Sequence, residues 1–276
     1  MKNLLKFFLS QFGKLLFFLM NNKLGIYISD SFLNSKINHS KGISIKNINF
    51  LLHTPTYLTK YRYRTFFSKE PETIEWIDNF EKDSVFFDIG ANVGLYSIYA
   101  SVSKNSKVFS FEPSFFNLEL LARNIYSNKL EKKIVVVPLP LNDKISISNF
   151  DLTSTDWGGA LSTFEKGFND SGEAINAKFS YKTLGITLDR LVETFNLPNP
   201  SYIKIDVDGL EHFIISGGRN LISKASEILI EVNDNFLDQN KKVNYFLNEA
   251  GFKLDKKVYS YPKIRGVANQ IWIRKI

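Results

Sequence analysis

Cysteine is absent from this chain of 276 residues, and histidine is scarce, with only His39, His53 and His212. The lack of cysteine excludes a disulfide scaffold, a thiolate zinc site and a cysteine nucleophile. Three scattered histidines give no basis for a histidine metal site. Hydrophobic residues still make up 44% and charged residues 23% of the chain, which is typical of a globular protein with a large core.

Acidic residues are almost missing from the first quarter of the sequence. Residues 1–69 contain 11 lysines or arginines and one acid, Asp30, whereas residues 70–276 contain 24 basic and 27 acidic residues. The basic start indicates an anionic neighbour such as lipid headgroups or nucleic acid. The acidic remainder, which also lacks an Asn/Asp-Pro-Pro-aromatic motif, gives no reason to expect nucleic acid.

Residues 4–20 are mostly leucine and phenylalanine, and Lys6, Ser10 and Lys14 recur among them every four residues. A polar stripe at this spacing predicts an amphipathic helix. The segment is too short and too charged to span a membrane, and no small-x-small cleavage site follows for a signal peptide. Two interpretations stay open, namely an in-plane helix in peripheral contact with a membrane and a helix that docks on protein. We expect a cytoplasmic protein.

Residues 1–60 are interpreted as a basic extension, which is mostly loop over residues 21–56 with a strand at Gly42–Ile48. From residue 61 on, strand-like and helix-like patterns alternate, which is typical of a doubly wound α/β sheet. The predicted strands are Val85–Asp88, Val108–Glu112, Ile134–Val137, Tyr202–Val207 and Ile228–Val232. The predicted helices are Leu95–Ser103, Phe115–Tyr126, Leu210–Ile215 and Val243–Glu249. Phe252–Leu254 and Gln270–Arg274 predict an antiparallel hairpin at the sheet edge, and residues 138–190 predict an elaborated segment near the active face.

The first strand ends in Asp88 and continues into a helix through Gly90 and Gly94, and the next strand ends in Glu112. Ligands of doubly wound sheets bind beyond the carboxyl ends of the strands, where a carboxylate can accept hydrogen bonds from a ribose diol. A nicotinamide enzyme would need G-x-G-x-x-G, and Asp88 would repel its pyrophosphate. The sulfonium and ammonium groups of S-adenosylmethionine favour an acid at this position. We therefore predict S-adenosylmethionine as the cofactor.

The run from Phe87 to Ser97 resembles the FkbM-type methyltransferases. Further motifs carry the same resemblance: Phe111-Glu-Pro113, Asn124, Leu188-Asp189, Lys204-Ile-Asp-Val-Asp-Gly209 with Glu211, Gly217, Ile230-Glu231 and, upstream, Lys69-Glu-Pro-Glu-Thr-Ile-Glu-Trp76. The resemblance covers roughly residues 60–276. It implies a class I methyltransferase fold, a Rossmann-like seven-stranded sheet whose last strand is antiparallel. It also implies methyl transfer from S-adenosylmethionine, generally to a hydroxyl of a sugar or a natural product.

The chain departs from the family at Asp208, where glutamate is frequent, and at Leu141-Asn-Asp143, where a small residue and serine usually precede the aspartate. Asp143 resembles the family position near the adenine amine. The motifs and the resemblance together give these expected cofactor-binding residues: Asp88, Gly90, Asn92, Gly94, Glu112, Pro113, Asn142, Asp143 and Asp206.

Asp206 closes the fourth predicted strand, where it shares one face with Lys204, and Glu211 and His212 follow in the next turn. Crowded acids repel, so at least one should have a raised pKa that suits a base for a sugar hydroxyl. We favour Asp206 near the sulfonium, with Glu211 or His212 as the base. The alternatives are a divalent cation held by D-x-D-x-x-E and a helix cap neutralised by Lys204. Glu231, at the end of the fifth strand, is a second candidate base or acceptor ligand.

The expected catalytic residues are thus Asp206, Glu211, His212, Lys204 and Glu231, and no metal is expected. Trp157-Gly-Gly-Ala160 is either a sugar platform with a mobile lid or a plain turn. The sequence predicts an O-methyltransferase for a sugar, a glycan or a glycolipid precursor, with a place in polysaccharide biosynthesis. Methylation of a small natural product or peptide, a nicotinamide oxidoreductase and a non-catalytic membrane-associated binding module are the competing hypotheses.

Overall fold

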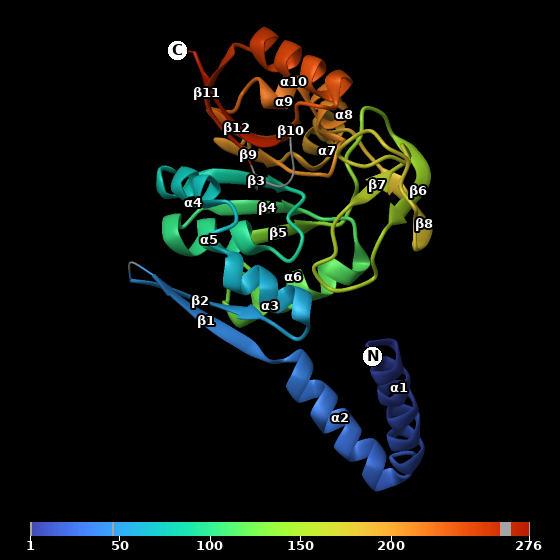
Figure 1. Ribbon diagram of the computed structural model, residues 1–276. Helices are drawn as coiled ribbons and strands as arrows, with labels where there is room; N and C mark the ends of the chain where they lie inside the picture. Colours follow the sequence, from blue (N-terminus) through green and yellow to red (C-terminus); the bar gives the residue numbers. More distant parts are fainter. Residues whose placement is uncertain (1, 46, 260–265, 276) are drawn as a thin grey trace.

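The computed structural model describes residues 2–45, 47–259 and 266–275 (Figure 1). Seven strands form one sheet in the spatial order β11-β12-β10-β9-β3-β4-β5. In chain order these strands are β3 (Val85–Ile89), β4 (Lys107–Phe111), β5 (Ile134–Val137), β9 (Tyr202–Ile205), β10 (Glu227–Asn233), β11 (Phe252–Tyr259) and β12 (Val267–Arg274). The last strand, β12, is antiparallel to both neighbours, and the other pairs are parallel. The predicted class I methyltransferase sheet is confirmed.

All five strands predicted from apolar runs lie in this sheet, each within two residues of its predicted ends. The edge hairpin forms as well, because Phe252 pairs with Arg274 and Leu254 with Trp272. The chain builds outward in opposite directions from the neighbours β3 and β9. The carboxyl ends of these two strands therefore border the crevice in which doubly wound sheets bind ligands.

Helices cover both faces of the sheet because their apolar stripes need burial (Figure 1). One face carries α4 (Pro71–Asp78), α5 (Leu95–Lys104) and α6 (Phe115–Ser127), with α3 (Tyr57–Thr65) just before them. The other face carries α7 (Leu188–Phe195), α8 (Glu211–Ser216), α9 (Arg219–Ile222) and α10 (Leu237–Glu249). Each layer has its own apolar cluster, so the sheet is buried on both sides and holds its strand ends rigidly.

Between β5 and α7 the chain makes a second, antiparallel sheet in the order β7-β6-β8. Its strands are β6 (Ser146–Leu152), β7 (Ser162–Phe164) and β8 (Phe179–Gly185). Phe150, Leu152 and Phe164 pack with Leu210, which lies between β9 and α8. This small sheet therefore stands over the end of β9, and the elaborated segment lies at the active face of the main sheet.

The loops expected over residues 21–56 are wrong, because this part forms α2 (Lys23–Ile37) and a hairpin of β1 (Ser40–Ile45) and β2 (Ile48–His53). Serine, asparagine and glycine interrupt the apolar residues of α2, which hid its helical period. The single strand expected at Gly42–Ile48 is interrupted by a turn with Asn47 in a left-handed conformation. Phe50 and Leu52 of β2 are buried in the apolar cluster formed with α4, α5 and α6.

The first helix, α1 (Lys2–Leu19), and α2 project together from the rest of the protein (Figure 1). Every large apolar side chain described in α1 is exposed, from 40% for Leu16 to 75% for Phe17. The helix therefore does not bury its apolar side chains against the described part of the chain. None of the described helices combines the length and apolarity that crossing a membrane would need.

Candidate active site

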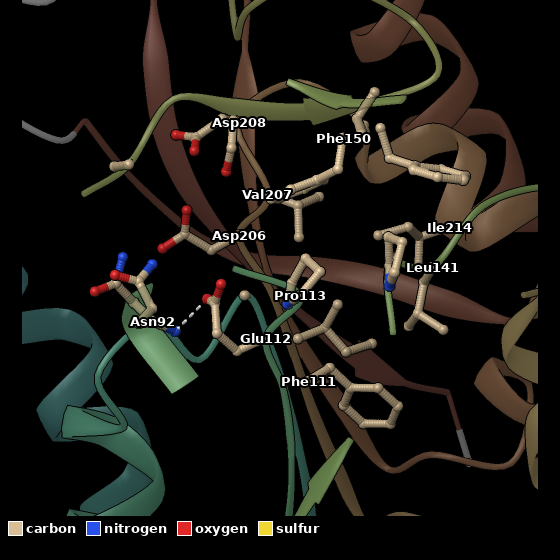
Figure 2. A pocket seen from close by; sticks show the side chains of 18 of the residues that line it. Asn92, Phe111, Glu112, Pro113, Leu141, Phe150, Asp206, Val207, Asp208 and Ile214 are labelled. Carbon is tan, nitrogen blue, oxygen red and sulfur yellow. Dashed lines mark hydrogen bonds between the residues drawn. The ribbon is translucent and has the colours of Figure 1, made fainter. Parts of the chain in front are cut away.

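A cavity lies beyond the carboxyl ends of β3, β4 and β9 (Figure 2). Its apolar wall comes from separate segments of the chain: Phe111, Leu141, Phe150 and Ile214. Three carboxyl groups gather at its other end: Glu112, Asp206 and Asp208. An apolar body with a few convergent polar groups is typical of a small-molecule or cofactor site.

Glu112 follows β4 and points into the cavity, as expected from the sequence (Figure 2). Its carboxylate accepts hydrogen bonds from the backbone amides of Asn92, at 2.9 Å, and Ser114, at 2.8 Å. Burial nevertheless raises the pKa of Glu112 to about 7. Two oxygens with two amide donors leave lone pairs free to accept from a diol. The adjoining Pro113 also lines the cavity.

The glycine turn after β3 brings two strand ends into contact. Gly90 has φ 85°, and a Cβ at this position would lie 1.8 Å from the carbonyl oxygen of Asp206. Gly94 has φ 83° and lets α5 approach Leu121 of α6. Only glycine fits both the left-handed conformation and the close approach at these positions.

The amides of residues 90–94 are already occupied as hydrogen-bond donors. Those of Gly90 and Ala91 donate to the carbonyl of Phe111, and those of the next three residues donate to Glu112, to the Asn92 side chain and to the Ala91 carbonyl. A dinucleotide-binding turn needs free amides that point at its phosphates. This turn therefore lacks the donors for a pyrophosphate, as the absence of G-x-G-x-x-G led us to expect.

Asp88, expected to contact the cofactor, does not line the cavity. It is 1% exposed and accepts a hydrogen bond from Ser97 Oγ at 2.5 Å. Burial raises its pKa, and the charge of Lys204 opposes the shift. Asp88 and Lys204 are paired residues on the neighbouring strands β3 and β9. The positive charge that acts on Asp88 in this structure is therefore that of Lys204.

Asp206 directly follows the end of β9 and lines the cavity. Its Oδ2 lies 2.6 Å from Lys204 Nζ, and the lysine side chain is 1% exposed, against 26% for Asp206. Burial acts to raise the pKa of Asp206, but Lys204 and Lys69 hold it below its usual range. Conversely, burial acts to lower the pKa of Lys204, and the carboxylates of Asp206 and Glu70 raise it. Both groups of the pair are thus charged at neutral pH.

Asp208 also lines the cavity, although the sequence indicated it only as a departure from the family and as part of the alternative D-x-D-x-x-E cation motif. Its backbone is left-handed, with φ 55°, and its Oδ2 accepts from the amide of Leu161 at 2.7 Å. Burial raises the pKa of Asp208 to about 6, and the neighbouring Asp206 adds to the shift. Among the three carboxyl groups at this end of the cavity, only Glu112 has a pKa closer to 7 than that of Asp208.

The segment from Trp157 to Leu161 forms part of the cavity roof, since Gly159 and Ala160 line it. The Gly159 carbonyl accepts hydrogen bonds from the side-chain amides of Asn92, at 2.7 Å, and Asn117, at 3.1 Å. Arg62 of α3 holds the neighbouring Gly158 carbonyl with Nε at 2.8 Å. Three separate elements thus fasten this segment over the cavity, so it forms a fixed part of the roof.

Glu211 and His212, the expected bases, line neither this cavity nor the second cavity that is described below. Glu211 is 1% exposed and accepts from the amides of Val207, at 3.0 Å, and Gly209, at 3.1 Å, and from the side chain of Gln239. His212 is 2% exposed beside Phe213 and Phe236. Both residues therefore lie in or beside the β9–α8 turn, and Glu211 stabilises it through these backbone amides.

Four more expected residues also lie outside the lining of both cavities, namely Gly94, Asn142, Asp143 and Glu231. Asn142 is 2% exposed and donates to Glu165 at 2.5 Å, and Asp143 lies 3.7 Å from Lys166, whereas their neighbour Leu141 does line the cavity. Glu231, near the end of β10, lies close enough to Asp206, Asp208 and Glu211 for their charges to act on it. Burial raises its pKa well above the usual range, and the charges of Asp206 and Glu70 add to this shift.

A second cavity adjoins the first, and both are lined by Gly90, Asn92 and Asp206. Its outer wall contains Lys69 and Glu70, whose side chains lie 2.7 Å apart. These residues and Tyr96, which donates to Glu70 at 2.9 Å, were missed as site residues. The Lys69-Glu-Pro motif was the signal that could have found them.

No group of three or more histidine or acidic residues in the described ranges has a geometry that would hold a metal ion. The residues present do fit S-adenosylmethionine. The apolar wall suits an adenine, Glu112 keeps acceptor capacity for a ribose diol, and Asp206 and Asp208 suit a positive centre.

The sheet order and this nucleoside-type cavity define a class I methyltransferase domain. The chain belongs to the FkbM methyltransferase family, because the model of the methyltransferase FkbM domain matches residues 88–254. The suspected family is thereby confirmed, together with the methyltransferase class and S-adenosylmethionine as the cofactor of the matched domain, residues 88–254.

Among proteins of known function, the chain is similar to the hexuronic acid methyltransferase AglP of Haloferax volcanii. The two are 27% identical over 180 residues, which cover 63% of this chain and 65% of that protein. The chain therefore matches somewhat less than two thirds of the relative's length.

Solved structures with a similar arrangement include a precorrin-6y C5,15-methyltransferase from Geobacter metallireducens, with a TM-score of 0.44 and 16% identity over 75% of this chain and 87% of that chain. M. jannaschii TYW2 in complex with AdoMet gives a TM-score of 0.45 and 12% identity over 86% of this chain and 87% of that chain.

Proposed function

We propose that the protein transfers a methyl group from S-adenosylmethionine to a hydroxyl of a sugar within a glycan or a glycolipid precursor. The observation that supports this best is the cavity in which Glu112, Asp206 and Asp208 face an apolar wall. Similarity to a hexuronic acid methyltransferase supports a sugar as the acceptor. Residues 61–276 would carry this activity, with the β1–β2 hairpin packed against them.

In this proposal the adenine occupies the apolar wall of the first cavity, and Glu112 accepts from the ribose hydroxyls. Asp206, which lines both cavities, would hold the positive end of a bound cofactor. Lys204 positions Asp206 through their 2.6 Å ion pair. Glu211 positions the same turn through the backbone amides that it accepts from.

The acceptor enters through the second cavity, between α3 and the end of β9. Its hydroxyl oxygen bonds to the methyl carbon as the carbon–sulfur bond breaks, and the sulfur keeps the bonding pair. Most of the rate comes from holding these atoms in line. The hydroxyl proton passes to a carboxylate, and Asp208 suits this role because its pKa of about 6 is near the working pH.

We also propose that α1 contacts a membrane surface peripherally and that the protein is otherwise cytoplasmic. Lys6 and Lys14 would face the headgroups while the exposed Phe and Leu side chains enter the interface. The test is co-sedimentation with vesicles that contain anionic lipid. Deleting residues 1–22 should abolish it, and equal binding by the shortened chain would contradict the proposal.

The activity is tested first by calorimetric titration with S-adenosylmethionine and, separately, with NAD. Saturable binding of S-adenosylmethionine alone supports the cofactor site. Transfer of radiolabelled methyl groups to hexuronic-acid glycosides and to lipid-linked glycans then tests the acceptor. Labelling of peptides or small natural products in place of these would contradict the sugar acceptor but leave the cofactor assignment standing.

A further inference from the structure

Carboxyl groups outnumber cations at the polar end of the first cavity, whose lining includes Glu112, Asp206 and Asp208 and no lysine or arginine among the described residues. Asp206 is paired with Lys204 at 2.6 Å. Asp208, by contrast, has no lysine or arginine nitrogen within 4.0 Å among the residues that the structure describes. It accepts hydrogen bonds from the backbone amides of Leu161 and Ser162, which carry no net charge. Asp208 therefore brings a negative charge to the cavity that the chain itself does not balance.

The groups around Asp208 add to this excess of negative charge. Lys69 Nζ lies 2.7 Å from Glu70 Oε1, so the charge of this lysine is already paired with the carboxylate of Glu70. The largest charge effects on Asp208 come from the acids Asp206, on its own turn, and Asp170, before β8, and Asp208 in turn acts on Glu112 after β4 and on Glu231 on β10, whereas the cations Lys204, Lys69 and Arg62 act on Asp206. A site with this surplus favours a cation.

The cofactor and its product differ at one place that this surplus can detect. S-adenosylmethionine carries a positive sulfonium, and S-adenosylhomocysteine carries a neutral thioether at the same sulfur. The adenosine, ammonium and carboxylate groups are common to both. A charge surplus beside the sulfur therefore changes their relative affinity without any difference in shape.

We propose that Asp208, with Glu231 behind it, distinguishes S-adenosylmethionine from S-adenosylhomocysteine by the charge on sulfur. This inference rests on the proposed function. The sulfonium balances the negative surplus before transfer, and the proton taken from the acceptor hydroxyl balances it afterwards. The net charge of the site is then the same on both sides of the reaction, and once this proton leaves, the neutral thioether of the product is held more weakly than the sulfonium of the cofactor.

Proton linkage makes the idea measurable without an acceptor. Burial raises the pKa of Asp208 to about 6, so this carboxyl group is partly protonated in slightly acidic solution, and burial also raises the pKa of Glu231 well above its usual range. A bound sulfonium lowers these pKa values and drives protons off. A bound thioether does not. Glu112 faces the ribose, which both ligands carry, so any proton that Glu112 releases on binding is the same for the two ligands.

The experiment is calorimetry of the full-length protein with each ligand in two buffers of different ionisation enthalpy, at about pH 6.5 and about pH 8. S-adenosylmethionine should release more protons than S-adenosylhomocysteine at the lower pH. It should also bind ~10-fold more tightly at the higher pH, with the ratio shrinking as the solution is acidified. Equal proton release and a pH-independent ratio would overturn the proposal.

Variants locate the effect. Asp208→Asn keeps an oxygen that accepts from Leu161 and removes only the charge, so it should weaken S-adenosylmethionine ~10-fold and S-adenosylhomocysteine less than ~2-fold. Glu231→Gln should act in the same direction, and Glu193→Gln, exposed on α7, is the matched control. Parallel weakening of both ligands in Asp208→Asn would contradict charge sensing while the cofactor assignment stands. If neither ligand binds the unaltered protein, the proposed cofactor site itself is wrong.

Discussion

Asp88 and Lys204 are paired residues on the adjacent parallel strands β3 and β9, and each side chain is 1% exposed. The Lys204 Nζ also lies 2.6 Å from Asp206 Oδ2. One buried lysine thus compensates two carboxyl groups that end neighbouring strands. A buried charge that loses its partner is expensive, so this lysine stabilises the strand ends on which the cavity is built.

Lys204→Met should lower the free energy of unfolding by ~3–5 kcal/mol, because it leaves Asp88 and Asp206 without their cation. The loss should be smaller in acid, since the lysine holds the pKa of Asp206 low and its contribution disappears as that carboxylate is protonated. Urea denaturation at neutral pH and at about pH 4 measures both. Lys242→Met, which removes an exposed ion pair with Asp238, is the control and should cost less than ~1 kcal/mol. Equal losses in the two variants would contradict this role.

Gly90→Ala should be far more damaging than an alanine at another left-handed glycine. The new methyl group would lie 1.8 Å from the Asp206 carbonyl oxygen, so β3 and β9 would have to separate. Gly167 has a similar φ of 70° but nothing within 4 Å of its Cβ position. Gly167→Ala should cost only the strain of the conformation, ~1–2 kcal/mol. Thermal unfolding compares the two, and similar melting temperatures would show that the close approach is not needed.

The sequence predicted the sheet well because its strands are buried on both faces and appear as plain apolar runs, as in Val108–Glu112. It also placed Glu112 and Asp206 correctly at the cavity, since parallel strands end on one edge. It could not show which way Asp88 points, because that depends on the register that sets Lys204 beside it. Glu211 shows the same limit: its carboxylate turns back to the amides of its own loop.

Glu112 should make the stability of the protein fall as the pH rises. Burial raises the pKa of Glu112 to about 7, above its value in the unfolded chain, so the folded state holds this proton more tightly. The ionised carboxylate therefore destabilises the fold above that pKa, by up to ~3 kcal/mol relative to acid solution. Glu112→Gln should show a smaller loss between about pH 5 and about pH 8 in urea denaturation. It should also bind S-adenosylmethionine more weakly, because Gln has one acceptor oxygen fewer for the ribose diol.

His212→Phe should leave cofactor binding intact and stabilise the protein in mild acid. Both ring nitrogens of His212 are buried without a hydrogen-bond partner, and the nearest carboxylate oxygen, on Asp238, is 3.8 Å away. Burial lowers the pKa of His212 to about 4, with Lys242 acting in the same direction. Because the unfolded chain takes up the proton more readily, the histidine destabilises the fold progressively as the pH falls below about 6.5.

The phenylalanine variant removes that penalty, so at about pH 5 it should be more stable than the unaltered protein by ~1–2 kcal/mol, whereas near pH 8 the difference should be small. The neighbours Phe213 and Phe236 already form an aromatic environment for the new ring. His39→Gln, at an exposed position, is the control for loss of a histidine. Calorimetric titration with S-adenosylmethionine completes the test: if His212→Phe loses cofactor affinity while its stability is unchanged, the histidine belongs to the site, and the packing role assigned to it here is wrong.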